Sequence, residues 1–212
     1  GDLVEEVARV GSRNKLQGEP LPRPDAGGPK AILTPMQKRE HFARRTMAAL
    51  GYNECVTYSF IDRKSAELFG GGDDATMLEN PISSDMSHMR PDLLAGLLQA
   101  AQRNQTRGFA DMALFEVGPA FHGGEPEEQN LQAAGLLVGR TGPKDVHGAS
   151  RNVDLFDAKA DAEAVLAAIG APAKVQILRD GAPWWHPGRH GRICLGPKKM
   201  LAVFGEVHPK TL

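Results

Sequence analysis

The sequence predicts an α+β domain in which an antiparallel sheet is flanked by helices. Helical and strand-like segments alternate in blocks, and few strands are separated by a full crossover helix, as a doubly wound fold would require. Two neighbouring apolar runs, residues 112–121 and 131–139, read as adjacent antiparallel strands. Three further strand-like segments follow one another near the end of the chain, at residues 174–178, 191–196 and 200–207.

Five segments are predicted to be helical, one of which begins at Pro91. Residues 2–10 place Leu3, Val4, Val7 and Val10 at helical spacing. Residues 35–50 begin with a strong start signal, because Thr34 can cap, proline occupies the first turn and Gln37 can reach back as in a capping box. Residues 63–72 read as a short helix closed by glycines, and residues 154–170 as a longer helix that ends at a glycine. Residues 54–61 are rich in β-branched and aromatic side chains and predict a strand.

The chain divides into two parts of very different composition. Glycine and proline recur between residues 11 and 30, which is typical of a linker or an extended strap. We therefore expect residues 1–28 to hold the terminal helix of a truncated upstream module and a linker, and residues 29–212 to form the core domain, incomplete at its C-terminal end. The first helix begins without an initiator methionine and the last strand stops the chain, so both ends are expected to lie inside a longer polypeptide.

Composition excludes some functional classes. The 212 residues carry a formal net charge of −1, which disfavours tight, independent binding of nucleic acid. No apolar run is long enough to predict a membrane span, and no signal peptide is visible. Cys55 and Cys194 each lie in an apolar, strand-like run, which predicts buried free thiols and a cytoplasmic location.

Three carboxylates share one face of the first predicted helix. Asp2, Glu5 and Glu6 stand at positions i, i+3 and i+4, and a hard cation such as Mg²⁺ prefers such a cluster of oxygen ligands. Acids at a helix start also favour the helix dipole, and Glu5 can pair with Arg9. Spacing alone favours this second explanation.

No catalytic constellation can be recognised in the remaining motifs. Gly70–Gly72 lack the Gly-Lys-Ser/Thr ending of a phosphate loop and predict a turn. The segment 183–193 combines two tryptophans, two histidines and two arginines. Pro187 and Gly188 exclude a helical metal pair there, so a hairpin anchored by aromatic packing is favoured over stacking of a tryptophan on a base. His208 has no identifiable catalytic partner.

Arg90 is the most informative single residue. It follows an extended segment and precedes Pro91, which is predicted to begin a helix whose apolar face is formed by leucines. Its guanidinium could grip a phosphate or carboxylate, or it could pair with Asp85, Asp92 or a neighbouring chain. A structural or subunit-interface role is favoured, shared with the leucine face made of Leu93, Leu94, Leu97 and Leu98.

The ordered motifs resemble the beta subunit of bacterial phenylalanyl-tRNA synthetase over nearly the whole chain. They are "DLVEEVAR", "LTPMQKRE", "ALGYNECVTYSF", "NPISSDMSHMRPDLLAGLL", "LFEVGPAF", "DLFDAKAD", "HPGRHGRI" and "FGEVHP". The resemblance implies a class II aminoacyl-tRNA synthetase-like domain that is a catalytically inactive copy. It would pair with the catalytic alpha subunit in an (αβ)₂ enzyme that binds ATP in the alpha subunit and charges tRNA with phenylalanine. We then expect an apolar surface that the alpha subunit covers.

The resemblance also bears on the acidic cluster. The family supplies Mg²⁺ ligands from an Asp-x-x-Glu-Glu set that matches Asp2, Glu5 and Glu6, although a further upstream aspartate of the pattern falls before Gly1. Two departures stand outside any proposed site: residues 11–17 read "GSRNKLQ" where "YGYDNIP" is common, and Ala160 stands where glycine is frequent.

Two rival functions remain open at this point. The first is an active class II-like enzyme that activates an amino acid. Asp92 stands two residues after Arg90, as an arginine-acid clamp requires, but Pro91 directs the chain into a helix, whereas a clamp needs both side chains on one face of a strand. The second rival is an autonomous RNA-binding module, with Arg44 and Arg45 of the helix 35–50 as possible tRNA contacts.

Overall fold

The computed structural model describes residues 1–22, 32–142, 146, 148 and 150–212. The chain forms two compact units, Gly1–Leu33 and Thr34–Leu212. The boundary expected near residue 29 lies outside the described residues. Among those residues, no helix is both long and apolar enough to cross a membrane.

The first unit is a helix followed by a single 3₁₀ turn. Helix α1 spans Asp2–Gly11, and η1 spans Arg13–Lys15. The four apolar residues of α1 are 73–84% exposed. The predicted helix is therefore present, but its apolar side has nothing to pack against among the described residues of this unit.

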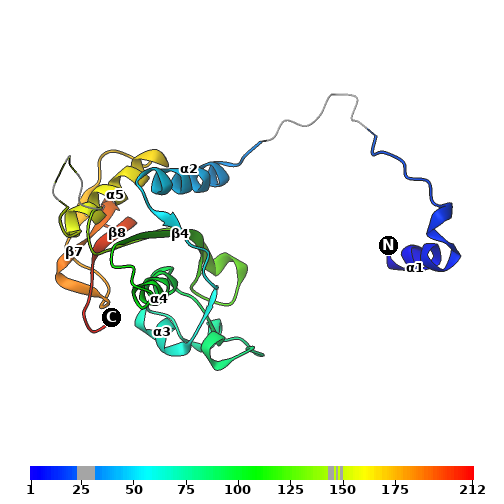
Figure 1. Cartoon of the computed structure of the whole chain (residues 1–212), viewed down its shortest axis with the longest axis horizontal. Coiled ribbons are helices and arrows are strands. Elements are labelled where there is room, and N and C mark those ends of the chain that lie inside the picture. The colour runs from blue at the N-terminus through cyan, green and yellow to red at the C-terminus, as the bar shows by residue number, and fades with distance from the viewer. Residues whose placement is uncertain (23–31, 143–145, 147, 149) are drawn as a thin grey trace. The chain divides into compact units, whose positions relative to one another are not determined.

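A three-stranded sheet lies at the centre of the second unit (Figure 1). Its order is β1 (Asn53–Glu54), β4 (Met112–Phe121) and β5 (Gln129–Val138). Strands β4 and β5 pair antiparallel along their full length, as the sequence predicted, whereas β1 runs parallel to β4. The antiparallel hairpin therefore makes up most of the sheet.

Side chains of β4 alternate between two hydrophobic cores, because successive residues of a strand point to opposite faces. Ala113, Phe115 and Val117 face helices α2 (Pro35–Ala49) and α5 (Leu155–Ala168). Leu114 faces α4 (Leu94–Gln105), where it packs against Leu97. Helices thus cover both faces of the sheet.

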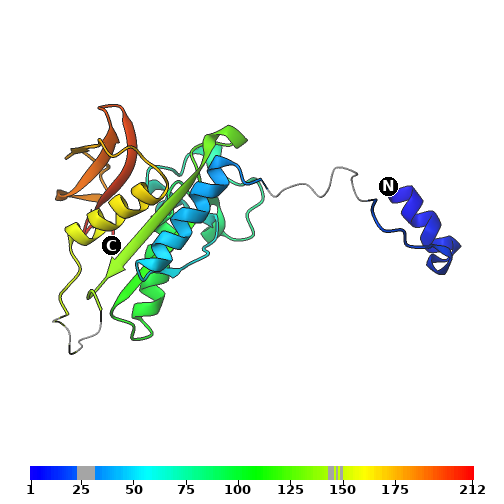
Figure 2. The same cartoon turned by 90° about the horizontal axis from the view of Figure 1, so that it is seen from above.

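A second sheet packs against the other side of α5. It consists of β6 (Gln176–Leu178), β7 (Trp185–Leu195) and β8 (Lys199–Val207), all antiparallel. Leu166 of α5 packs on Ile193 and Phe204 of this sheet. Figure 2 shows β7 and β8 in orange and red beside the yellow α5.

The remaining elements are short. They are α3 (Arg63–Leu68), β2 (Phe60–Ile61), which pairs with β3 (His88–Met89), and the 3₁₀ turns η2 (Asp74–Thr76), η3 (Ser84–Met86) and η4 (Pro126–Glu128).

The predicted start of the helix 35–50 is confirmed. The Thr34 hydroxyl accepts a hydrogen bond from the Gln37 amide, and the Gln37 side chain accepts one from the Thr34 amide, which makes a complete capping box. These bonds satisfy two backbone groups that would otherwise lack partners at the start of the helix.

Three predicted elements differ from the structure. The described strands form three separate sheets instead of one. The expected strand 54–61 is interrupted, because its middle leaves β4 after Cys55 and bonds elsewhere. The helix expected to begin at Pro91 begins at Leu94, since the chain is still extended at Arg90 and turns only afterwards.

Candidate functional site

Arg90 lies in the interior of the second unit, with only 2% of its surface exposed. Its Nη1 donates hydrogen bonds to Glu116 Oε1 at 2.7 Å and to Thr57 Oγ1 at 2.9 Å, and its Nε donates to the Pro119 carbonyl at 3.0 Å. The Thr57 hydroxyl in turn donates to Glu116 Oε2 at 2.7 Å. A buried charge is tolerated when it is paired and hydrogen-bonded, and here Glu116 pairs with the guanidinium while Nη1 and Nε donate hydrogen bonds within the chain.

The backbone around Arg90 completes the connection between two segments. The Arg90 amide donates to the Ser59 carbonyl, and the Phe121 amide donates to the Arg90 carbonyl, both at 2.9 Å. Gly118 lies against the guanidinium, because a Cβ built there would stand 2.8 Å from Arg90 Nη2. Arg90 therefore ties the segment after β1 to strand β4 and uses its donors within the chain.

The expected partners of Arg90 were wrong. Neither Asp85 nor Asp92 pairs with it; its partner is Glu116, which is only 4% exposed. Asp92 instead accepts the Leu94 amide at 2.8 Å, and burial raises the pKa of its carboxyl. The signal that could have identified Glu116 is a single acid inside the apolar run "MALFEVGPAF", since a buried carboxylate needs a cation.

The leucines predicted to accompany Arg90 are mostly internal. Leu93 and Leu97 have no exposed surface, Leu94 is 6% exposed, and Leu98 is partly buried against the cluster that contains Leu94. These side chains hold α4 to the sheet and to its neighbours. These leucines therefore pack in the interior of the domain, and a partner subunit would have to contact a different surface.

An exposed apolar row lies on the segment that runs from β1 into β2. Val56 is 92% exposed, Tyr58 71% and Phe60 37%, whereas the intervening residues turn inward. Thr57 and Ser59 are bonded to Glu116 and Arg90, which fixes the alternation. Strand β1 also forms an edge of its sheet. A cluster of exposed apolar side chains beside an edge strand is a typical site for protein association.

The two arginines expected as tRNA contacts differ in their surroundings. Arg44 forms ion pairs with Glu40 at 3.0 Å and Glu54 at 3.1 Å, and its Nη2 donates a hydrogen bond to the Val117 carbonyl at 2.8 Å, so it holds α2 to the sheet. Arg45 is exposed and has no ion pair among the described residues. Of the two, only Arg45 presents an unpaired charge.

The acidic face of α1 does not converge into a metal site. Glu6 accepts Arg9 Nη2 at 2.6 Å, and Glu5 lies 3.8 Å from Arg13, so the expected pairing of Glu5 with Arg9 was wrong. Among the described residues, no group of three histidine, cysteine or acidic side chains is placed to hold a metal ion. Asp2, Glu5 and Glu6 have the right ligand chemistry for Mg²⁺ but do not form a site by themselves.

The segment 183–193 is part of a strand instead of a separate hairpin. Trp184 packs edge-on against Phe69, with ring centroids 5.7 Å apart, and thereby joins the second sheet to α3. His190 Nδ1 contacts the His186 carbonyl at 2.7 Å, while the rings of His186 and His208 stack at 6.3 Å. The expected aromatic packing is therefore present, but Trp184 packs against Phe69 and not within a separate hairpin.

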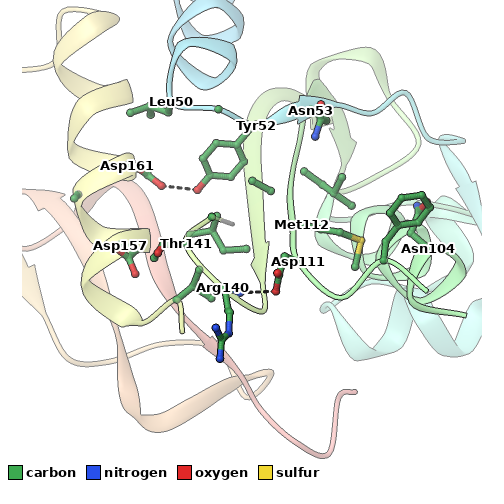
Figure 3. A pocket seen from close by; sticks show the side chains of 18 residues that line it. Leu50, Tyr52, Asn53, Asn104, Asp111, Met112, Arg140, Thr141, Asp157 and Asp161 are labelled. Atoms are coloured by element: carbon green, nitrogen blue, oxygen red, sulfur yellow. Dashed lines mark hydrogen bonds between the residues drawn. The ribbon is translucent and has the colours of Figure 1, made fainter. Parts of the chain in front are cut away.

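The structure contains a cavity of about 860 Å³ near the ends of α2 and α4 (Figure 3). Tyr52 donates a 2.5 Å hydrogen bond to Asp161 across its upper part, and burial together with Asp161 raises the pKa of the tyrosine hydroxyl. On the other side the Arg140 amide donates to Asp111 at 2.9 Å. These pairs connect neighbouring elements on opposite sides of the cavity.

Both cysteines are free thiols, as predicted. Cys194 is buried, whereas Cys55 is only partly buried, and burial raises the pKa of its thiol. A thiol with a raised pKa is a poor nucleophile, because the thiolate is the reactive form. Cys55 is therefore a packing residue beside α4.

Comparison with known proteins identifies the family. A family model described as the phenylalanyl tRNA synthetase beta chain CLM domain matches residues 20–212. The chain belongs to the phenylalanyl-tRNA synthetase beta chain family. It is 77% identical to the phenylalanine–tRNA ligase beta subunit of Ruegeria pomeroyi, 70% to that of Cereibacter sphaeroides and 50% to that of Rhodospirillum rubrum, in each case over all of this chain and 26% of the relative. The chain thus spans about a quarter of these relatives' length.

The fold of this beta chain segment recurs in other tRNA synthetases. Two structures of pyrrolysyl-tRNA synthetase from Desulfitobacterium hafniense superpose with TM-scores of 0.56 and 0.57 at 13% and 15% identity. They cover 95% and 98% of this chain, and the chain covers 60% and 64% of them. The architecture is therefore α+β and class II synthetase-like, as the sequence predicted.

Proposed function

We propose that this chain is a non-catalytic, partner-binding core of the beta subunit. In the full (αβ)₂ enzyme it would pair with the alpha subunit, which binds ATP and charges tRNA with phenylalanine in the cytoplasm. The relatives' name, a beta subunit of phenylalanine–tRNA ligase, supports a partnered role. The free thiols of Cys55 and Cys194 fit a reducing compartment.

The exposed apolar row is the observation that carries this proposal. Val56, Tyr58 and Phe60 project from the segment that follows an edge strand, and their inward neighbours are held by the Arg90 network. The row is therefore presented on a rigid support, which lowers the entropic cost of association. Aromatic and branched apolar residues on such a surface are typical of the core of an interface.

The same network argues against catalysis by this chain. Nε and Nη1 of Arg90 are bonded to Pro119, Thr57 and Glu116, so binding a phosphate through these atoms would require breaking a buried ion pair. Removing one partner of a buried pair costs about 3–5 kcal/mol. This cost supports a structural use of the arginine over an amino-acid-activating enzyme.

Association with the alpha subunit provides the test. Purified alpha subunit should bind the chain, and a Val56→Glu/Tyr58→Glu variant should bind at least about tenfold more weakly, because charges would be buried in the interface. Ile82→Glu is the matched control, since Ile82 is 95% exposed on another loop. A wild-type chain that ignores the alpha subunit, or a control that loses binding equally, would contradict the proposal.

We also propose that Mg²⁺ of the full enzyme uses Asp2, Glu5 and Glu6 only together with ligands from outside this chain. The pairing of Glu6 with Arg9 and the absence of a converging group among the described residues support this view. Calorimetric titration of the chain with Mg²⁺ should show no site with a dissociation constant below the millimolar range. Micromolar binding that Glu6→Gln abolishes would contradict the proposal.

A further inference from the structure

The near-neutral net charge of the chain conceals a strong separation of charge. Residues 174–212 contain seven lysines and arginines against two acids, a formal charge of +5. Residues 1–173 contain eighteen basic residues against twenty-four acids, a formal charge of −6. The basic part coincides with the sheet β6-β7-β8, which Figure 2 shows as a separate layer beside α5.

Both acids of this basic part are already paired. Asp180 binds the guanidinium of Arg192, and Glu206 accepts Arg189 Nε at 2.6 Å. The five remaining cations are exposed and have no ion pair among the described residues: Lys174, Arg179, Lys198, Lys199 and Lys210. The unpaired charge of the sheet is therefore entirely positive.

Strand register brings three of these lysines to one end of the sheet. Lys198 and Lys199 follow the turn at Gly196, whose φ of 67° allows β7 to reverse into β8. Strand β6 pairs with β7 through Gln176 opposite Cys194. Lys174, two residues before Gln176, therefore lies beside this turn. We call Lys174, Lys198 and Lys199 the lysine tip.

The composition of the tip selects the class of ligand. Lysine is depleted in the cores of protein–protein interfaces, whereas it is a frequent contact to nucleic-acid phosphates. Its ammonium group is a flexible point charge that binds phosphate without demanding a fixed geometry. Three such groups around one turn fit a run of backbone phosphates better than a protein surface.

We propose that the lysine tip binds the phosphate backbone of a structured RNA. This inference deepens the proposed function, because it names the surface of this chain on which the tRNA of the full enzyme would lie. It adds a contact surface on the sheet β6-β7-β8 to the α2 surface, where Arg44 is paired with Glu40 and Glu54 and Arg45 alone of the two expected contacts is unpaired. Binding at the tip needs no contact with the exposed apolar row.

The test measures binding of labelled tRNA by the 212-residue chain over a series of salt concentrations. Neutralising the tip with Lys174→Gln, Lys198→Gln and Lys199→Gln should weaken binding at least about tenfold at low salt. It should also reduce the magnitude of the slope of log K against log salt by about 2–3, at about 0.7–0.9 for each of three phosphate contacts. The matched control removes the same charge from α2 with Lys38→Gln, Arg39→Gln and Arg45→Gln, and should reduce the slope by less than the tip variant does.

Three results would overturn the inference: no binding of tRNA by the wild-type chain, an unchanged slope in the tip variant, or an equal loss in the α2 control. Competition by polyglutamate as effective as that by RNA would reassign the tip to acidic proteins. Thermal unfolding checks that the triple variant is folded, and Lys198→Gln alone, with about one third of the slope change, serves if it is not. Alpha-subunit binding is measured in parallel, so that either proposal can fail alone.

Discussion

Arg90 and Glu116 form a buried ion pair, 2.7 Å between Nη1 and Oε1, with both side chains almost completely removed from solvent. The pair joins the segment after β1 to the central strand β4, and the Thr57 hydroxyl bridges the two charged groups. The exposed apolar row alternates with residues held by this network. The orientation of the exposed apolar row thus depends on the buried Arg90–Glu116 pair.

Removing one charge of this pair should destabilise the domain strongly. Glu116→Ala leaves the Arg90 guanidinium buried without its counter-ion, which costs about 3–5 kcal/mol. Urea unfolding followed by circular dichroism measures the change. The double variant Arg90→Met/Glu116→Leu should be less destabilised than Glu116→Ala, because it buries no unpaired charge. A Glu116→Ala variant as stable as the wild type would show that the pair contributes nothing.

Shortening a core side chain of α4 should also be costly. Leu97 has no exposed surface and packs against Leu114. Leu97→Ala removes apolar contacts and leaves a cavity, with an expected loss of about 2–5 kcal/mol in the free energy of unfolding. Gln102→Ala, on the exposed side of the same helix, should change it by less than about 0.5 kcal/mol. Equal effects of the two substitutions would place Leu97 outside the core.

Two aspartates should give the stability opposite dependences on pH. Burial raises the pKa of Asp92, so the folded state binds its proton more tightly than the unfolded state does. The favourable contribution of this group is complete below the unfolded value of about 3.9 and is lost as pH rises through the folded pKa. Asp92→Asn should therefore gain stability relative to the wild type between acidic and neutral pH.

Asp157 is the matched case of opposite sign. Hydrogen bonds from Arg151 at 2.6 and 2.7 Å lower the pKa of its carboxyl. Its contribution is present above the unfolded value and is lost as pH falls through the lowered pKa. Asp157→Asn should therefore be less stable than the wild type at neutral pH, with the difference shrinking in acid. Denaturant unfolding at several pH values measures both variants, and parallel profiles would refute the assignment.

The chain alone should not bind the substrates of amino-acid activation. Nη1 and Nε of Arg90 are bonded within the chain, and its guanidinium is paired with the buried carboxylate of Glu116. Calorimetry with ATP and phenylalanine should give no heat of a micromolar site. Micromolar binding of either compound would restore the amino-acid-activating enzyme as the better hypothesis. Adenosine serves as the control for weak, nonspecific stacking.

Local signals in the sequence were sufficient for most of the elements and for the fold class. The capping box at Thr34, the leucine spacing after Arg90 and the two apolar runs that form β4 and β5 depend on neighbours within a few residues. Such patterns can be recognised in the sequence, because helix capping depends on residues within one helical turn and strand alternation depends on successive residues. The ordered motifs, taken together, were specific enough to indicate the family.

Only the tertiary structure decided what each polar residue does. Glu116 lies 26 residues from Arg90, and Lys174 reaches the turn at Gly196 only through the pairing of β6 with β7. The register between distant strands depends on packing across the whole domain, which no local pattern encodes. By itself the sequence indicated an α+β, class II-like chain and favoured a structural or subunit-interface role for Arg90, without identifying its partner. The fold makes that arginine an internal support and brings Lys174 beside the distant Lys198 and Lys199 in a candidate RNA-binding tip.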